Sequence, residues 1–336
     1  MESILQFIAE IHSHIMDVDR IAYLVSAICL TMIAGMITGP LAGNANSFLW
    51  GVCDALFGRF GDRMDRVTRA RPDLMFRGFL YTVTILFFAL FLGHISSWIN
   101  ASFIEVTLVS LCLTSGSVWY IIIKLYFALD QYGSVEGAYY GLSRSSRVDL
   151  NGTDDYGITR TGLTYAAVSF DKGLIAPSIW YLIGGLPVML VYSALSFTAW
   201  RYGKSGFTKG FGVVPLALEK IMGFFPSLFA GFLFSAASAI TPSAKLHQAV
   251  LSWWGRKGRA PYEQGGIVLS AIAWPLDVSL GGPIQDISGS NLRNVWVGPD
   301  GATAQLNHKH LQRGIFINVI AHTLFILALL LGYIYG

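Results

Sequence analysis

The chain has 336 residues, of which 54% are hydrophobic and only 13% are charged, and its mean hydropathy is +0.54. These values lie well outside the range of soluble globular proteins and exclude that class. The net charge of +3 carries little information, because the distribution of charge matters more than its sum in a membrane protein. The composition predicts an integral membrane protein whose partner is the lipid bilayer, and no nucleic-acid partner is expected.

The first 19 residues do not have the pattern of a signal peptide. They hold four acidic residues and no Lys or Arg, whereas a signal peptide needs basic residues before a short apolar core. We therefore expect this segment to be retained. Apolar residues recur in it at helical spacing and predict an amphipathic helix on the membrane surface: Ile4, Phe7, Ile8, Ile11 and Ile15.

Six later segments are each apolar over the length of about 20 residues that crosses a bilayer. They cover residues 21–39, 76–98, 106–129, 174–200, 222–240 and 314–335. The predicted fold is all-α: a polytopic membrane protein of about six transmembrane helices, with amphipathic helices and a candidate re-entrant helix in addition. We expect a single membrane domain over residues 1–336, with cytoplasmic insertions at about 44–75, 130–173 and 243–313.

The first insertion indicates the orientation of the chain. It is rich in arginine, and positively charged loops face the cytoplasm; the arginines are Arg59, Arg63, Arg66, Arg69 and Arg71. Alternation of the spans then places the other two insertions in the cytoplasm as well. A multi-pass protein of the cell inner membrane is expected, although Arg201, Lys204 and Lys209 would fall outside if the fourth span were a plain crossing.

The fourth span is unusual for a segment in lipid. It begins within TYAAVSFDKGLIAPSIWYLIGGLP at 164–187, which carries Asp171 and Lys172 and is interrupted by Pro177, Gly184, Gly185 and Pro187. Irregular backbone at membrane depth is tolerated only inside protein or along a wet cavity, so we expect this span to be re-entrant or bent. The two charges are either functional intramembrane groups or edge residues whose Lys reaches the interface.

Residues 265–283, GGIVLSAIAWPLDVSLGGP, form a second ambiguous segment. Its apolar core is too short to span a bilayer, and Pro275 and Asp277 interrupt it. A buried helix and a second re-entrant element are both compatible with this pattern.

Metal and phosphate sites have weak signals. Cys29, Cys53 and Cys112 are too scattered for a metal cluster, and His308 and His310 have no carboxylate or cysteine close in sequence. No metal ligands are predicted from these residues. The loop GKSGFTKG at 203–210 lacks the first glycine and the strand of a nucleotide P-loop. An exposed flexible loop is its favoured interpretation, with phosphate binding through Lys204 or Lys209 as the alternative.

Several ordered segments resemble one membrane-protein family. These are ITRTGLTYAAVSFDKGLIAPSIWYLIGGLP, MLVY, Phe211-Gly212, GIVLSAIAWPLDVSLGGP and VWVG. In order and spacing they resemble the CobD/CbiB family over residues 39–298. Proteins of this family attach the aminopropanol arm to adenosylcobyric acid in cobalamin biosynthesis.

The positions that match the family are mostly backbone-determining residues. Asp149 falls on the aspartate of a Gly-Arg-Asp-Thr motif, and Arg160 keeps its place. The other matches are Gly157, Gly173, Ala176, Pro177, Gly184, Gly185, Pro187, Tyr192, Gly266, Leu280, Gly281, Gly282, Pro283 and Gly298. The resemblance implies that the prolines and glycines of the fourth span are required by the fold.

The departures concern charged positions. Val168, Ser169 and Lys172 stand in the Glu-Asn and Asp-Gly motifs, with Asp171 displaced by one residue. Residues 196–200 replace an Asn-Thr-Leu-Asp-Ser motif, and Glu219 is one surviving carboxylate of two in the Ala-Arg-Leu-Asp-Asp motif. Gln264 and Leu269 replace the Asn and the Glu of the last motif.

The resemblance implies an ATP-dependent amide-forming ligase, if catalysis survives these departures, with ATP and Mg as cofactors and a corrinoid substrate. The implied roles are metal binding or proton acceptance for Asp149, Asp171 and Glu219, and contact with phosphate or a corrin carboxylate for Arg160 and Lys172. The alternative is a non-catalytic scaffold, sensor or accessory protein with an unidentified protein partner, which resembles AmpE-type proteins. A transporter has little support, because no inverted repeat is visible.

Overall fold

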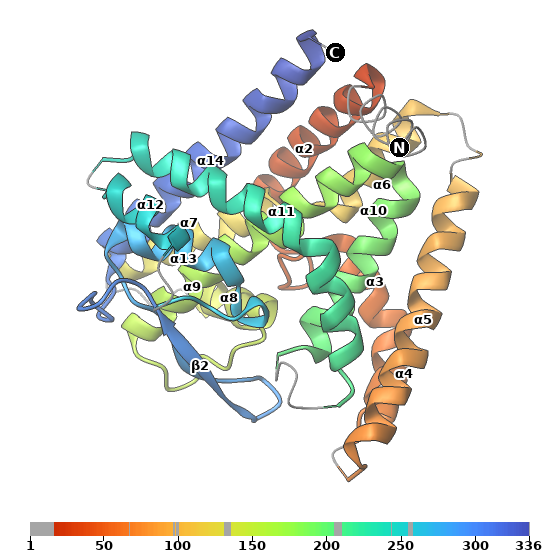
Figure 1. The fold of residues 1–336 in the computed structure, drawn as a ribbon, viewed down its shortest axis with the longest axis horizontal. Helices are drawn as coiled ribbons and strands as arrows, with labels where there is room; N and C mark the ends of the chain where they lie inside the picture. The colour runs from red at the N-terminus through yellow and green to blue at the C-terminus, as the bar shows by residue number, and fades with distance from the viewer. Residues whose placement is uncertain are drawn as a thin grey trace.

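A computed structural model describes residues 17–66, 68–96, 98, 101–130, 136–204, 210–242, 244–254 and 258–335. The predicted N-terminal amphipathic helix lies outside these residues, and so does Lys209. Figure 1 shows a bundle of long helices with a small hairpin, labelled at β2, at the end of the molecule away from the C-terminus.

Six helical segments are long and apolar enough to cross a membrane. They are α2 (Val18–Thr38), α5 (Arg71–Ser96), α6 with α7 (Ser102–Cys112 and Gly116–Asp130), α9 through α10, α11 (Val213–Ile240) and α14 (His308–Tyr335). The segment from α9 to α10 consists of α9 (Asp155–Phe170), the π-helical turn η2 (Asp171–Ile175) and α10 (Ala176–Tyr202). The six predicted spans and the all-α polytopic membrane fold are thereby confirmed.

Shorter elements fill the polar insertions. The first holds α3 (Phe48–Cys53), η1 (Asp54–Gly58) and α4 (Arg59–Met64), and α8 covers Glu136–Ser146. The last holds α12 (Leu246–Trp254), η3 (Tyr262–Gln264) and α13 (Gly266–Leu276). An antiparallel hairpin of β1 (Leu280–Gln285) and β2 (Asn291–Val297) follows, with Leu280 opposite Val297. The sequence did not predict this hairpin.

The second half of the predicted polar loop at 130–173 is in fact a buried helix. α9 packs against α7 and α14. Gly162 makes this approach possible, because a Cβ at that position would lie 2.8 Å from Leu125 of α7. Ala166 and Ala167 are likewise small and buried. Small and hydroxyl-bearing residues that read as surface are therefore a helix-packing face, and the loop prediction was wrong for 155–170.

The fourth span is bent, as one of the two predictions for it stated. Gly185 has φ 68° and ψ −165°, a conformation that breaks α10 and that residues with a Cβ avoid. Arg20 of α2 donates a hydrogen bond from Nη1 to the Leu182 carbonyl, 3.4 Å away, just before the break. A backbone acceptor beside the bend is thus satisfied by protein, as a membrane interior requires.

Residues 266–276 form a short buried helix rather than a span. Nine of the eleven residues of α13 are buried, and the helix packs against α11 and α12. It ends at Asp277, whose φ of 57° is left-handed. α13 thereby connects the membrane helices to the hairpin.

Candidate functional site

A cavity of about 170 Å³ lies where the membrane helices meet the polar insertions. We call it the first cavity. Its lining comes from the residues before and within α3, the ends of α8 and α10, and α9, η2, η3 and the hairpin. Most of the lining is apolar, and its charged side chains are Arg160, Lys172, Lys204 and Glu263. Such a site suits a ligand with a large apolar body and a few polar anchors.

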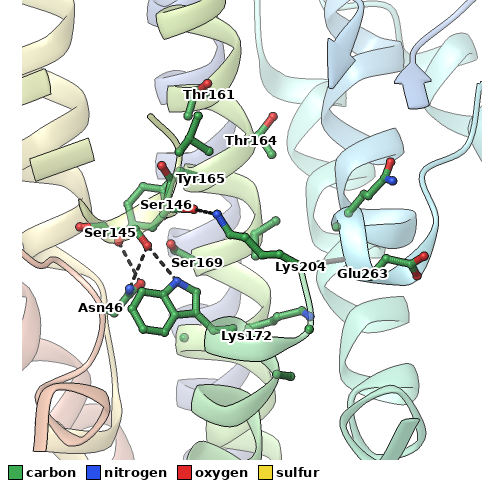
Figure 2. A pocket seen from close by; sticks show the side chains of 18 of the residues that line it. Asn46, Ser145, Ser146, Thr161, Thr164, Tyr165, Ser169, Lys172, Lys204 and Glu263 are labelled. Carbon is green, nitrogen blue, oxygen red and sulfur yellow. Dashed lines mark hydrogen bonds between the residues drawn. The ribbon is translucent and has the colours of Figure 1, made fainter. Parts of the chain in front are cut away.

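α9 contributes one complete face to the first cavity. Thr161, Thr164, Tyr165, Val168 and Lys172 all line it, and their spacing of three or four residues places them on the same side of a helix. Figure 2 shows three of them, Thr161, Thr164 and Tyr165, along the helix, with Glu263 across the cavity.

A hydrogen-bond network stiffens one wall. The Ser145 carbonyl accepts from Asn46 Nδ2 and from Trp200 Nε1, each at 3.0 Å. Tyr165 donates its hydroxyl to Asn46 Oδ1 at 3.2 Å. These bonds join α8, α9, α10 and the segment before α3 in one arrangement (Figure 2).

The opposite wall is tied to the hairpin. Gln264 of η3, which replaces a family asparagine, accepts a hydrogen bond at Oε1 from the Val295 amide at 2.9 Å. Glu263 and Gly265 line the cavity beside it, together with Gly281 and Ile284 of β1. The hairpin therefore closes the cavity even though the sequence gave no sign of a strand.

Arg160 lies at the edge of the first cavity. Its Nη1 donates to the Ala304 carbonyl at 2.6 Å, and its guanidinium carbon lies 5.3 Å from the ring centroid of Trp296. Ring contact and one backbone acceptor fix the position of the guanidinium and leave its other donors available to a ligand.

Lys172 and Glu219 form a buried ion pair. The Lys172 Nζ lies 3.0 Å from Glu219 Oε1 and 4.5 Å from the ring centroid of Tyr262. Glu219 has no exposed surface, and 15% of the Lys172 side chain is exposed. Tyr262 also donates its hydroxyl to the Glu219 carbonyl at 3.1 Å. The edge position that the sequence allowed for Lys172 is therefore wrong, since this side chain reaches inward.

Asp171 is buried next to this pair and does not line the first cavity. Its Oδ2 accepts from Ser227 of α11 at 2.6 Å, and its relative exposure is 2%. Asp171 starts the π-helical turn η2, and π-turns inside helices frequently occur at functional sites.

Asp149 belongs to a different part of the site region. Its Oδ1 accepts from the Asn151 amide at 3.0 Å, and its own amide donates to the Gln285 carbonyl at 2.7 Å. Asp149 thus shapes the turn after α8 and joins it to β1. It is not among the residues that line the first cavity, whereas its neighbour Val148 is.

The family resemblance implies Mg-ATP, and the donor set can be tested against it. Within the part of the chain that the structure describes, no group of three His, Cys, Asp or Glu side chains could share a metal ion. Among the described residues that line the first cavity, Glu263 is the one carboxylate, and Glu219 is already paired with Lys172. These residues do not form a magnesium site by themselves, so no step is assigned to a metal.

Lys204 is a site residue that sequence reasoning treated only as part of a flexible loop. Its Nζ donates to the Ser146 carbonyl (Figure 2) and lies 3.4 Å from Asp286 Oδ1. Burial and the charge of Arg147 lower its pKa to about 7, although Asp286 opposes the shift. The sequence spaces Lys204 and Asp286 more than 80 residues apart, so no local pattern could have joined them.

Comparisons with known proteins agree with this architecture. Residues 32–317 match the family described as CobD/Cbib protein. Over 185 residues the chain is 28% identical to the cobalamin biosynthesis protein CobD of Brucella anthropi, covering 54% of this chain and 56% of that protein. It is 26% identical over 234 residues to CobD of a Sinorhizobium species, covering 67% and 72%. CobD of Rhodobacter capsulatus is 27% identical over 152 residues, covering 45% and 47%.

The matched region spans little more than half of the Brucella anthropi relative. No solved structure matched the chain. The family match covers the helices from within α2 into α14, and with them every segment that lines the first cavity. The chain is a divergent member of the CobD/CbiB family.

Proposed function

We propose that this chain performs the CobD-type reaction, in which a carboxyl group of adenosylcobyric acid forms an amide with aminopropanol or its phosphate. One observation carries the proposal. Family-like segments that are distant in sequence, around Arg160, Gln264 and Gly281, meet at the first cavity. A fold does not fix a function, but convergence of the family's segments on one cavity supports a shared binding site.

In this proposal Arg160 and Lys172 face the anionic groups of the substrates, because both cations line the cavity. Asp171 and Glu219 act as positioning residues: Glu219 holds Lys172, and Asp171 fixes η2 against α11 through Ser227. Asp149 acts through the turn that it stabilises. Bond formation joins the amine nitrogen to the carboxyl carbon, and one carboxyl oxygen leaves with a phosphoryl group from ATP as the co-substrate.

We place the protein in the inner membrane as a single domain whose insertions at about 44–75, 130–173 and 243–313 meet the cytoplasm. The arginines of the first insertion support this orientation. The nucleotide and the amine would then be available on the side where the first cavity's polar edge lies.

The test is expression in cells that lack their own aminopropanol-attaching enzyme and are supplied with cobyric acid. Mass spectrometry should detect cobinamide or its phosphate. If the protein is folded in the membrane and no product forms, the reaction is wrong for this chain. The non-catalytic alternative then gains from the observation that Asp171 and Glu219 are already satisfied by Ser227 and Lys172.

A further inference from the structure

A second cavity, of about 160 Å³, adjoins the first. The two cavities share Lys204 and Leu292 in their linings. Unlike the first, the second cavity is lined almost entirely by charged and hydroxyl side chains. They are Asp62, Asp65, Arg147, Arg201, Tyr202, Lys204, Asp286, Ser288 and Ser290.

We propose that the second cavity binds a phosphate group, with Arg147 as its principal ligand and Lys204 and Ser290 as supporting ligands. The group belongs to a soluble phosphate compound or to a phospholipid headgroup. The proposal does not rest on the proposed reaction, because it concerns side chains outside the set assigned to that reaction.

The charges on one wall of the second cavity are unbalanced. Arg147 Nη2 lies 3.6 Å from Asp286 Oδ2, and Lys204 Nζ lies 3.4 Å from Asp286 Oδ1. Two cations thus share one carboxylate, which leaves a positive charge in excess beside a polar space. On the other wall, Asp62 already accepts from Arg201 at 2.7 Å and from Tyr202 at 3.2 Å. An anion against Arg147 would restore the balance locally.

The hydrogen bonds on the same wall also point to an acceptor-bearing ligand. Asp286 Oδ2 is occupied, because it accepts from the Ser288 amide at 3.1 Å and from the Ser288 hydroxyl at 2.6 Å. Arg147 Nε is buried and has no hydrogen-bond partner among the described residues. Its ion contact with Asp286 is longer than a hydrogen bond. Asp286 Oδ1 also lacks a hydrogen bond there, but Lys204 faces it.

The backbone holds Arg147 in place at a conformational cost. Its φ is +56°, in the left-handed region that residues other than glycine seldom adopt. Backbone pairing with the hairpin fixes this conformation: the Ile287 amide donates to the Arg147 carbonyl at 3.3 Å, and Val148 forms a bridge with Asp286. Strain of this kind concentrates at binding sites. The guanidinium also lies over the Trp200 ring, 5.4 Å from the centroid, an arrangement that leaves its donor edges free.

Arginine presents a rigid fork of donors that matches phosphate, and the serine hydroxyls add neutral donors. Ser288 and Ser290 lie with their Oγ atoms 3.3 Å apart. Ser288 is committed to Asp286, so Ser290 is the hydroxyl that can turn toward a ligand. These features together favour phosphate over a cationic ligand.

The experiment is calorimetric titration of the purified full chain in detergent with inorganic phosphate. We expect saturable binding, at least tenfold weaker in Arg147→Gln and at least threefold weaker in Lys204→Met and in Ser290→Ala. The matched control is Arg144→Gln, because Arg144 is exposed, bonds to Tyr140 and lines neither cavity. Its affinity should equal that of the natural chain.

Absence of saturable binding to the natural chain, or equal affinity in Arg147→Gln, would overturn the proposal. If Arg147→Gln does not fold, equal affinity in both Lys204→Met and Ser290→Ala would overturn it as well. Repeating the titration in phosphatidylcholine nanodiscs with and without phosphatidic acid identifies the source. Weaker phosphate binding in the presence of phosphatidic acid supports a headgroup, and unchanged binding supports a soluble phosphate.

Discussion

The Lys172 ammonium lies 3.0 Å from Glu219 Oε1, and the carboxylate has no exposed surface. The two residues come from different membrane segments, η2 and α11. This pair connects the charged part of the fourth span to the rest of the bundle. It also explains why a lysine is tolerated there: the lysine has a partner inside the protein.

Removing one member of this pair should destabilise the protein strongly. We expect Glu219→Leu to lower the free energy of unfolding by about 3–5 kcal/mol, because Lys172 would be left as an unpaired buried charge. The double variant Lys172→Met/Glu219→Leu should recover most of the loss. Unfolding in mixed detergent micelles measures both.

The control for this prediction is Lys220→Met, since Lys220 is the next residue but is exposed. Its effect should be within about 0.5 kcal/mol. A double variant as unstable as the single one would show that the pair is not the source of the effect.

Gly173 is required by a close contact between η2 and the loop before α7. A Cβ at Gly173 would clash with the Cγ2 methyl of Thr114, whose amide donates to the Gly173 carbonyl at 2.9 Å. We expect Gly173→Ala to cost about 1–3 kcal/mol through overpacking. Thr114→Ser removes that methyl and keeps the hydroxyl that bonds to the Ala45 carbonyl at 2.6 Å.

The double variant Gly173→Ala/Thr114→Ser should therefore be more stable than Gly173→Ala alone. The cycle is read from thermal unfolding of the four proteins in one detergent. Strict additivity of the two substitutions would contradict a direct steric contact.

The pH dependence of stability should change when Lys204 is replaced. Burial lowers the pKa of Lys204 to about 7, whereas the unfolded chain titrates near its ordinary value of about 10.4. Between these values the unfolded state binds more protons, so this residue makes stability increase as pH rises through that window. Arg147 and Asp286 face Lys204 and keep their charges across it.

Lys204→Met should thus flatten the rise of the unfolding temperature between pH 7 and pH 9 relative to the natural chain. The difference between the two proteins removes the contribution of other titrating groups. Parallel pH profiles would mean that Lys204 is not desolvated in the folded protein.

Arg160 and Asp149 should differ in their effects on product formation. Arg160 lines the first cavity, and Asp149 supports a turn outside it. We expect Arg160→Ala to reduce product at least tenfold without a comparable loss of folded protein. Asp149→Ala should reduce the amount of folded protein and the product together. Equal specific activity of Arg160→Ala and the natural chain would remove Arg160 from the site.

The sequence predicted the membrane spans well because each is a long apolar run, and the bend at Gly185 because Gly and Pro mark it. It missed the hairpin, since Gly281, Gly282 and Pro283 make β1 look like a loop. It also missed the contacts of Arg147 and Lys204 with Asp286. These join positions far apart in the chain, and only the assembled fold brings them together.

The most direct test of the central claim combines product formation with occlusion of the first cavity. Purified protein would receive adenosylcobyric acid, aminopropanol phosphate, ATP and magnesium, with the amide product followed by mass spectrometry. The blocking variant is Thr164→Trp, which places a large ring in the cavity. The control is Thr84→Trp on the exposed face of α5.

We predict product from the natural chain and from Thr84→Trp, and none from Thr164→Trp. Product from a folded Thr164→Trp at the natural rate would contradict the assignment of the first cavity as the substrate site. Absence of product from all three folded proteins would contradict the proposed reaction itself.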